Sequence, residues 1–88
     1  MGGGGVPSGG VYVYHGRFGD LPVRGAKPNS RYDLYVNGKK AQSRWFDNNG
    51  KVFKNKDYFH QDSRGNHEFP HFHEWVWKDD TPFRMWKI

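Results

Sequence analysis

The chain has 88 residues, a net charge of +5 and no cysteine. A chain of this length forms one small domain, and the absence of cysteine excludes a disulfide scaffold, a cysteine zinc site and thiol catalysis. No apolar run approaches the ~20 residues that cross a bilayer as a helix, so we expect no membrane partner. Hydrophobic residues make up 34% of the chain and aromatic residues 18%. We therefore expect a core built largely from aromatic rings, which bury about 150–250 Å² each.

The excess positive charge is confined to the first half of the chain. Residues 1–44 contain seven Lys or Arg and two Asp, whereas residues 45–88 contain seven basic and seven acidic residues. This asymmetry favours an anionic partner, either nucleic acid or an acidic protein, although positive charge also serves solubility. The candidate nucleic-acid-binding residues are Arg17, Arg24, Lys27, Arg31, Lys51 and Trp77.

The N-terminal part predicts a flexible lead followed by one strand. Residues 1–10 are dominated by Gly, as in a linker, and lack the charged and apolar stretches of a signal peptide. The sequence leaves open whether the protein is cytoplasmic or a delivered or secreted effector. Residues 11–14 are β-branched and aromatic, which is typical of a strand, whereas three Gly and two Pro in 15–29 predict an irregular loop.

The segment 31–46 carries the clearest hairpin signal. Two runs of alternating character, 31–36 and 39–46, flank the dipeptide Asn37-Gly38. This dipeptide favours a type I′ turn, because both central residues of that turn need a positive φ. The sequence therefore predicts two antiparallel neighbouring strands here.

The remaining elements extend this hairpin into a meander. Further strands are expected over 51–59, 71–77 and 83–87, separated by a polar loop at 60–70 and a turn at 78–82. No stretch shows the 3.6-residue apolar period of a helix. The sequence predicts a mostly β fold, a small antiparallel meander sheet of four to six strands with little or no helix, in a single domain over 11–88. The residues expected to be most buried are Leu34, Val36, Trp45, Val52 and Trp75.

Histidines cluster in the second half of the chain. Four of the five, His60, His67, His71 and His73, lie within fourteen positions. On a strand, His71 and His73 share one face about 7 Å apart, a spacing that suits a metal site or an acid–base pair. The same two rings could equally pack as structural residues against the neighbouring Trp75 and Trp77.

Three functions are compatible with these residues. The first is metal-independent RNA cleavage, with acid–base candidates His60, His71 and His73 and anion stabilisers Arg31, Arg44 and Lys51. For this function we expect no cofactor and no metal. The second is a metal site, and a metal-dependent nuclease, with ligands from the set His71, His73, His60, Asp57 and Asp62. The third is binding without chemistry, with Tyr35, Trp75 and Trp77 as stacking platforms.

A pattern of short motifs runs from Pro28 to Trp77. It includes Arg-Trp-Phe-Asp at 44–47 and, most specifically, P-H-x-H-x-W at 70–75. This pattern resembles a C-terminal domain of bacterial polymorphic toxins and their prophage-borne relatives. The resemblance implies a nuclease acting on RNA, an upstream delivery region and an acidic immunity-type partner protein. It also implies an active site lined by Arg44, Asp57, His60, His71 and His73. The alternative is a non-enzymatic binding or structural module, such as a phage accessory protein.

Overall fold

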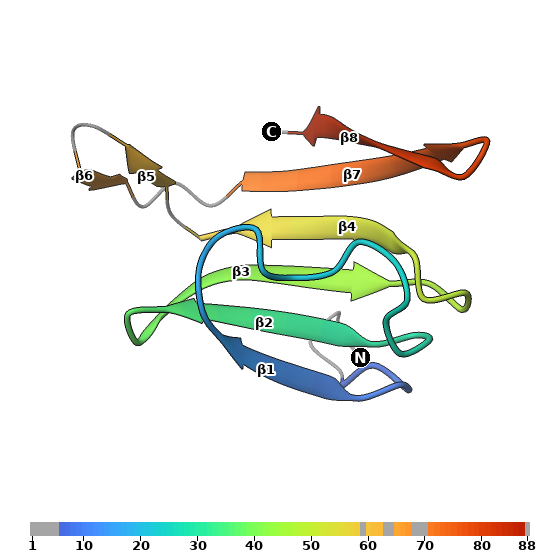
Figure 1. Ribbon diagram of the computed structural model, residues 1–88, viewed down its shortest axis with the longest axis horizontal. Helices are drawn as coiled ribbons and strands as arrows, with labels where there is room; N and C mark the ends of the chain where they lie inside the picture. The colour runs from blue at the N-terminus through green and yellow to red at the C-terminus, as the bar shows by residue number, and fades with distance from the viewer. Residues whose placement is uncertain (1–5, 59, 63–64, 68–70, 88) are drawn as a thin grey trace.

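The computed structural model describes residues 6–58, 60–62, 65–67 and 71–87, with side chains described for 6–58 and 72–85. The strands in this part are β1 (Val11–His15), β2 (Arg31–Val36), β3 (Lys39–Phe46), β4 (Val52–Asp57), β5 (His60–Asp62), β6 (Gly65–His67), β7 (His71–Lys78) and β8 (Thr81–Lys87). Six of them form one sheet in the order β1-β2-β3-β4-β7-β8, and β5 pairs with β6 (Figure 1). Among these residues there is no helix that could cross a membrane.

The predicted mostly β meander is confirmed. The β2–β3 hairpin has the predicted bounds, and its turn has φ of 52° at Asn37 and 79° at Gly38, as a type I′ turn requires. The pairs β3–β4, β4–β7 and β7–β8 are also antiparallel. The β5–β6 pair occupies part of the segment predicted as a polar loop.

The first strand departs from the meander pattern. β1 pairs with β2 in parallel, from Val11 opposite Arg31 to His15 opposite Tyr35. Two parallel neighbours cannot be joined by a tight turn, so the connection must cross over the sheet. Residues 16–30 make this crossing and pass over one face of β3 and β4 (Figure 1).

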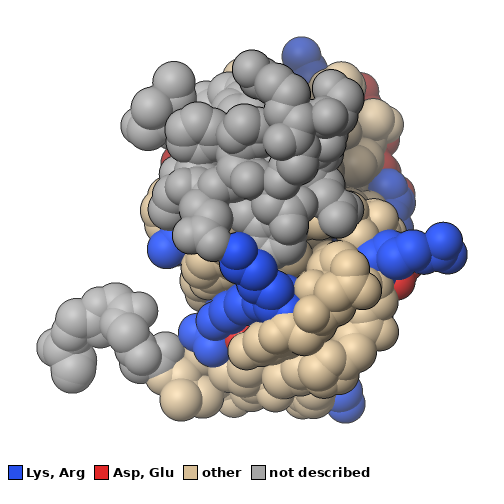
Figure 2. Space-filling view, turned by 90° about the vertical axis from the view of Figure 1, so that its left-hand side faces the viewer, with Lys and Arg blue, Asp and Glu red and all other residues tan. Residues whose placement is uncertain are grey.

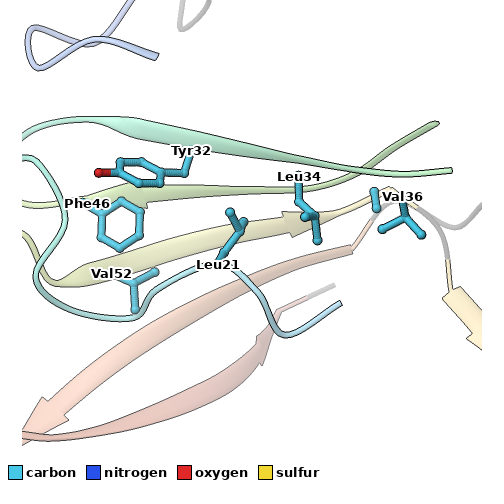
Figure 3. Packing of buried hydrophobic residues seen from close by; sticks show 7 residues of the cluster. Leu21, Tyr32, Leu34, Val36, Phe46 and Val52 are labelled. Atoms are coloured by element: carbon cyan, nitrogen blue, oxygen red, sulfur yellow. The ribbon is translucent and has the colours of Figure 1, made fainter. Parts of the chain in front are cut away.

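The crossing segment 16–30, here called the covering loop, is fastened to the sheet. The Val52 amide donates to the Val23 carbonyl at 2.9 Å, and the Ala26 amide donates to the Gly50 carbonyl at 3.2 Å. Leu21 of the loop belongs to the buried core (Figure 3). The face of the sheet beneath the loop is called the covered face below, and the opposite face is called the open face.

The core lies between the covering loop and strands β2, β3 and β4. Its buried hydrophobic members are Leu21, Tyr32, Leu34, Val36, Ala41, Phe46 and Val52 (Figure 3). Leu34, Val36 and Val52 were predicted to be buried, and they are. Trp45 and Trp75 are only half-buried. Each ring lies beside a cation at the margin of the core: Lys54 Nζ lies 4.5 Å from the Trp45 ring centroid, and Arg44 Cζ lies 5.4 Å from that of Trp75, which also packs against the core cluster.

Candidate functional site

A row of polar side chains crosses the covered face from β3 to β7. The strand register places Gln42 opposite Asp57 and Arg44 opposite Asn55, and Asn55 is in turn opposite His73. Directly opposed residues of antiparallel strands project from the same face, so the register alone gathers these five side chains. All five are buried. We call this group the buried polar row.

Asp57 is the centre of the buried polar row. Its Oδ1 accepts hydrogen bonds from Gln42 Nε2 at 2.9 Å and from Asn55 Nδ2 at 3.0 Å. Its Oδ2 lies 3.2 Å from His73 Nε2. Asn55 Oδ1 accepts from Trp75 Nε1 at 2.6 Å, which extends the network to a second residue of β7. Side chains from three strands therefore share one carboxylate, and the network ties β3, β4 and β7 together.

The surroundings of His73 disfavour its protonated form. Burial lowers the pKa of His73 below its ordinary value, and the positive charge of Arg84 lowers it further. The charge of Asp57 and its hydrogen bond act in the opposite direction without overcoming burial. The His73 side chain is 1% exposed. The pair is thus a carboxylate and an imidazole in contact, the combination used in acid–base catalysis, but sealed from solvent in this conformation.

Arg44 joins the buried polar row to the covering loop. Its Nη1 donates to the Leu21 carbonyl at 2.9 Å and to the Pro22 carbonyl at 3.1 Å. Burial lowers the pKa of Arg44, and the charge of Asp57 partly offsets this effect. Because the guanidinium is directed at backbone carbonyls and stacked near Trp75, it holds the loop rather than facing a solvent-filled site.

The structure brings together three of the five residues that the toxin resemblance assigns to an active site: Arg44, Asp57 and His73. The side chains of the other two, His60 and His71, lie outside the described residues. In the backbone, His71 is opposite Asp57 and His60 is opposite His67. Gln42 and Asn55 were not predicted from the sequence, and only the strand register reveals them as partners of Asp57.

The predicted nucleic-acid-binding residues do not form one surface. Arg24 and Lys51 both bind Asp80, at 2.9 Å and 3.1 Å, and both lie 5.0 Å from the centroid of the Trp77 ring. The hydrogen bond from Lys51 and the charge of Arg24 lower the pKa of Asp80, which stays ionised and neutralises part of their charge. Trp77 Nε1 donates to the Val52 carbonyl at 2.7 Å.

The other members of that predicted set lie apart from this cluster. Arg31 is paired with Asp33 at 3.1 Å. Arg17 and Lys27 are exposed residues of the covering loop. Tyr35, predicted as a stacking platform, is half-buried and lies against the His15 ring, with 5.5 Å between centroids.

The open face carries a second set of residues in which cations alternate with rings. Lys54 Nζ lies 4.5 Å from the Trp45 centroid and 6.0 Å from that of Phe72. Lys56 Nζ lies 4.9 Å from Tyr58 and 5.1 Å from Phe72. Four of these residues lie on β3, β4 and β7, and the fifth, Tyr58, follows β4 directly. Together, Trp45, Lys54, Lys56, Tyr58 and Phe72 are called the basic aromatic face below.

Further positive charge borders the basic aromatic face. Lys40 Nζ lies 5.2 Å from the Tyr58 centroid. Figure 2, which looks at the end of the sheet where the β2–β3 turn lies, shows Lys and Arg side chains gathered into a band with little acidic surface beside them. The sequence signal for this face was the Lys-x-Lys alternation of Lys54 and Lys56, which is common at solvated strand edges and does not by itself indicate a site.

Neither a metal-ligand cluster nor a known relative points to a function for these residues. Among the side chains that the structure describes, no three His, Asp or Glu residues come together as metal ligands. Comparisons with protein-family models, with curated proteins and with solved structures give no match to this chain.

Proposed function

We propose that this domain is a non-enzymatic module that binds single-stranded RNA across its basic aromatic face. The observation that carries the proposal is the interleaving of Lys54 and Lys56 with three rings on neighbouring strands. Proteins that bind single strands combine cations that follow the phosphates with rings on which bases stack.

The exposure of aromatic rings and the placement of charged residues support the same proposal. Phe72 and, farther along β4, Phe53 are 42% and 43% exposed, although burial of such rings is normally favourable. The acidic residue Asp33 is buried and already bound by Arg31 and Ser43, so its charge is not free to repel a phosphate. Lys54 and Lys56 contact rings, and the β4–β7 register places Glu74 opposite Lys54 and Phe72 opposite Lys56.

RNA cleavage is a second candidate function, favoured by the contact between Asp57 and His73 and by the resemblance to toxin domains. The burial of His73 and the attachment of Arg44 to the covering loop weigh against it as the resting activity, because a substrate phosphate would have to displace that loop. Binding on the open face needs no such rearrangement. We therefore place binding first and cleavage second.

The test measures affinity for a fluorescent oligouridine by anisotropy over a range of salt concentrations. The logarithm of the affinity should fall with the logarithm of the salt concentration, with a slope of about 0.7 per neutralised phosphate of a single strand. The double variant Lys54→Gln, Lys56→Gln should bind more weakly and reduce that slope by about 1.4. The matched control is Arg24→Gln, Lys51→Gln, which removes two cations from the Trp77 cluster and should leave both quantities near those of the parent.

Two outcomes would overturn the proposal. One is an affinity that does not change with salt or with the Lys54 and Lys56 substitutions. The other is cleavage of the oligonucleotide during the same incubation, detected on a gel with and without EDTA. Cleavage that persists in EDTA would favour the metal-independent nuclease, and cleavage that needs a metal would favour the metal-dependent one.

A further inference from the structure

A cavity opens beside the basic aromatic face at the end of β3. It has a volume of about 640 Å³, within the range of about 300–1,000 Å³ typical of small-molecule sites. The residues that line it are Pro7, Ser8, Asn29, Ser30, Trp45, Phe46, Asp47, Asn48 and Phe53. Flat apolar walls and a few polar groups are what a planar heteroaromatic ligand requires.

A β-bulge builds the aromatic part of this cavity. The pairing of β3 with β4 shifts register between Trp45 and Phe46, so that Trp45 faces Lys54 while Phe46 faces Val52. Phe53 is the extra residue of β4 and is turned outward, with 43% of its surface exposed. The bulge thus brings a second ring to the cavity beside Trp45 without removing Val52 from the core.

The polar residues of the cavity lining are Ser8, Asn29, Ser30, Asp47 and Asn48. Within the described residues, the side-chain amides of Asn29 and Asn48 make no hydrogen bond, whereas the backbone around them is fixed. The backbone N–H of Asn29 donates to the backbone carbonyl of Asp47 at 2.9 Å. The backbone N–H of Gly50 donates to the same carbonyl at 3.0 Å, and this second bond closes the turn that carries Asn48. Each carboxamide offers both donors and an acceptor, the pair of functions that recognises the edge of a base.

A cation stands beside the same cavity. Lys54 Nζ lies 4.5 Å from the centroid of Trp45, which is itself a cavity residue. A nucleotide whose base entered the cavity would have its phosphate within reach of this ammonium group, and the next phosphates would follow toward Lys56. The cavity is therefore continuous with the basic aromatic face.

We propose that this cavity receives one nucleobase of the bound strand and reads its edge through Asn48 and Asn29, so that the domain prefers RNA of a particular base. The inference rests on the proposed function, because the basic aromatic face supplies the general affinity for the strand. Trp45 and Phe53 then provide stacking for whichever base enters, and the two carboxamides discriminate among bases.

The experiment compares the affinities of labelled oligouridine, oligocytidine and oligoadenosine at one salt concentration. The parent should prefer one of them by about fivefold or more, which is the discrimination that a good side-chain contact to a base edge provides. Asn48→Ala should reduce the preference to within about twofold while leaving the affinity for the least preferred oligonucleotide unchanged. Asn49→Ala is the matched control, because Asn49 lies in the same turn but does not line the cavity, and it should keep the preference.

Each alternative outcome is decisive. Equal affinities of the parent for all three strands would overturn the base-reading cavity and leave the proposed function in place. A preference that survives Asn48→Ala, or an equal loss for all strands in that variant, would likewise overturn it. Absence of binding to every strand would overturn the proposed function and this inference together. Unfolding curves of the two Asn variants in urea, expected to coincide, separate these results from a loss of fold.

Discussion

Replacing Arg44 with Met would measure how firmly the covering loop is held. Met keeps an unbranched apolar stem but removes the guanidinium that donates to the Leu21 and Pro22 carbonyls. A hydrogen bond from a charged group contributes about 1.5–3 kcal/mol, so the two bonds amount to about 3–6 kcal/mol. These values are net contributions that already include the removal of the guanidinium from water. We therefore expect a loss of about 3–6 kcal/mol in the free energy of unfolding.

That loss is large for a domain of this size, because folded proteins are stable by only about 0.05–0.15 kcal/mol per residue. Urea unfolding followed by tryptophan fluorescence gives the free energy directly. Tryptic cleavage of the covering loop after Arg24, which is followed by Gly25, gives a second readout, and it should accelerate by more than the change in global stability explains. Cleavage specific to the loop would distinguish release of the loop from general destabilisation.

The control for Arg44→Met is Arg17→Met, which alters an exposed Arg of the same loop whose side chain makes no hydrogen bond or ion pair among the described residues. Its free energy of unfolding should change by less than about 0.5 kcal/mol. If Arg44→Met stays within about 1 kcal/mol of the parent and its loop is cleaved no faster, the two carbonyl contacts do not hold the loop.

Two further predictions concern pH and backbone geometry. Because burial lowers the pKa of His73 below its ordinary value of 6.5, protonation favours the unfolded chain, and stability should fall as pH falls through that value, by at most about 1.4 kcal/mol per pH unit. His73→Gln should remove this component of the pH slope, and equal slopes in parent and variant would contradict the assignment. Gly50 and Gly25 both have a φ of +73°, but only at Gly50 would an added Cβ overlap the Ala26 carbonyl. Gly50→Ala should therefore cost at least about 1 kcal/mol more than Gly25→Ala in urea unfolding, and equal costs would mean that the contact relaxes freely.

The parts of the fold that were predictable from the sequence are those coded locally. Asn37-Gly38 and the alternation on either side of it define the β2–β3 hairpin, because turn and strands are neighbours in the chain. The parallel pairing of β1 is different, since nothing within 11–14 indicates which strand will lie beside it. The β-bulge at Phe53 could not be predicted either. The alternation of side chains between the two faces of a strand assumes a regular ladder, and the bulge interrupts that ladder.

The sequence predicted which types of residue form the candidate sites, but it did not predict how they are arranged. Asp57 and His73 stand out in the sequence because Asp and His are common in catalytic sites. The same residue types also form buried hydrogen-bond networks, and the sequence does not distinguish a catalytic pair from a structural one. The register of three strands supplies what is missing, namely Gln42 and Asn55 around the carboxylate. The basic aromatic face escaped notice for a similar reason, because Trp45 and Phe72 come from strands distant in sequence.

The parallel pairing of β1 has a consequence for how the chain folds. Closing the connection of residues 16–30 costs about 2–3 kcal/mol of chain entropy before any contact across it forms. The meander β2–β3–β4 meets no such barrier, because its turns are short. The edge strand and the covering loop should therefore join a preformed sheet late and leave it early, as one cooperative unit. In native-state hydrogen exchange, the backbone amides of Gly16 and Ala26, which donate to the Tyr35 and Gly50 carbonyls, would then open together, ahead of those in β3.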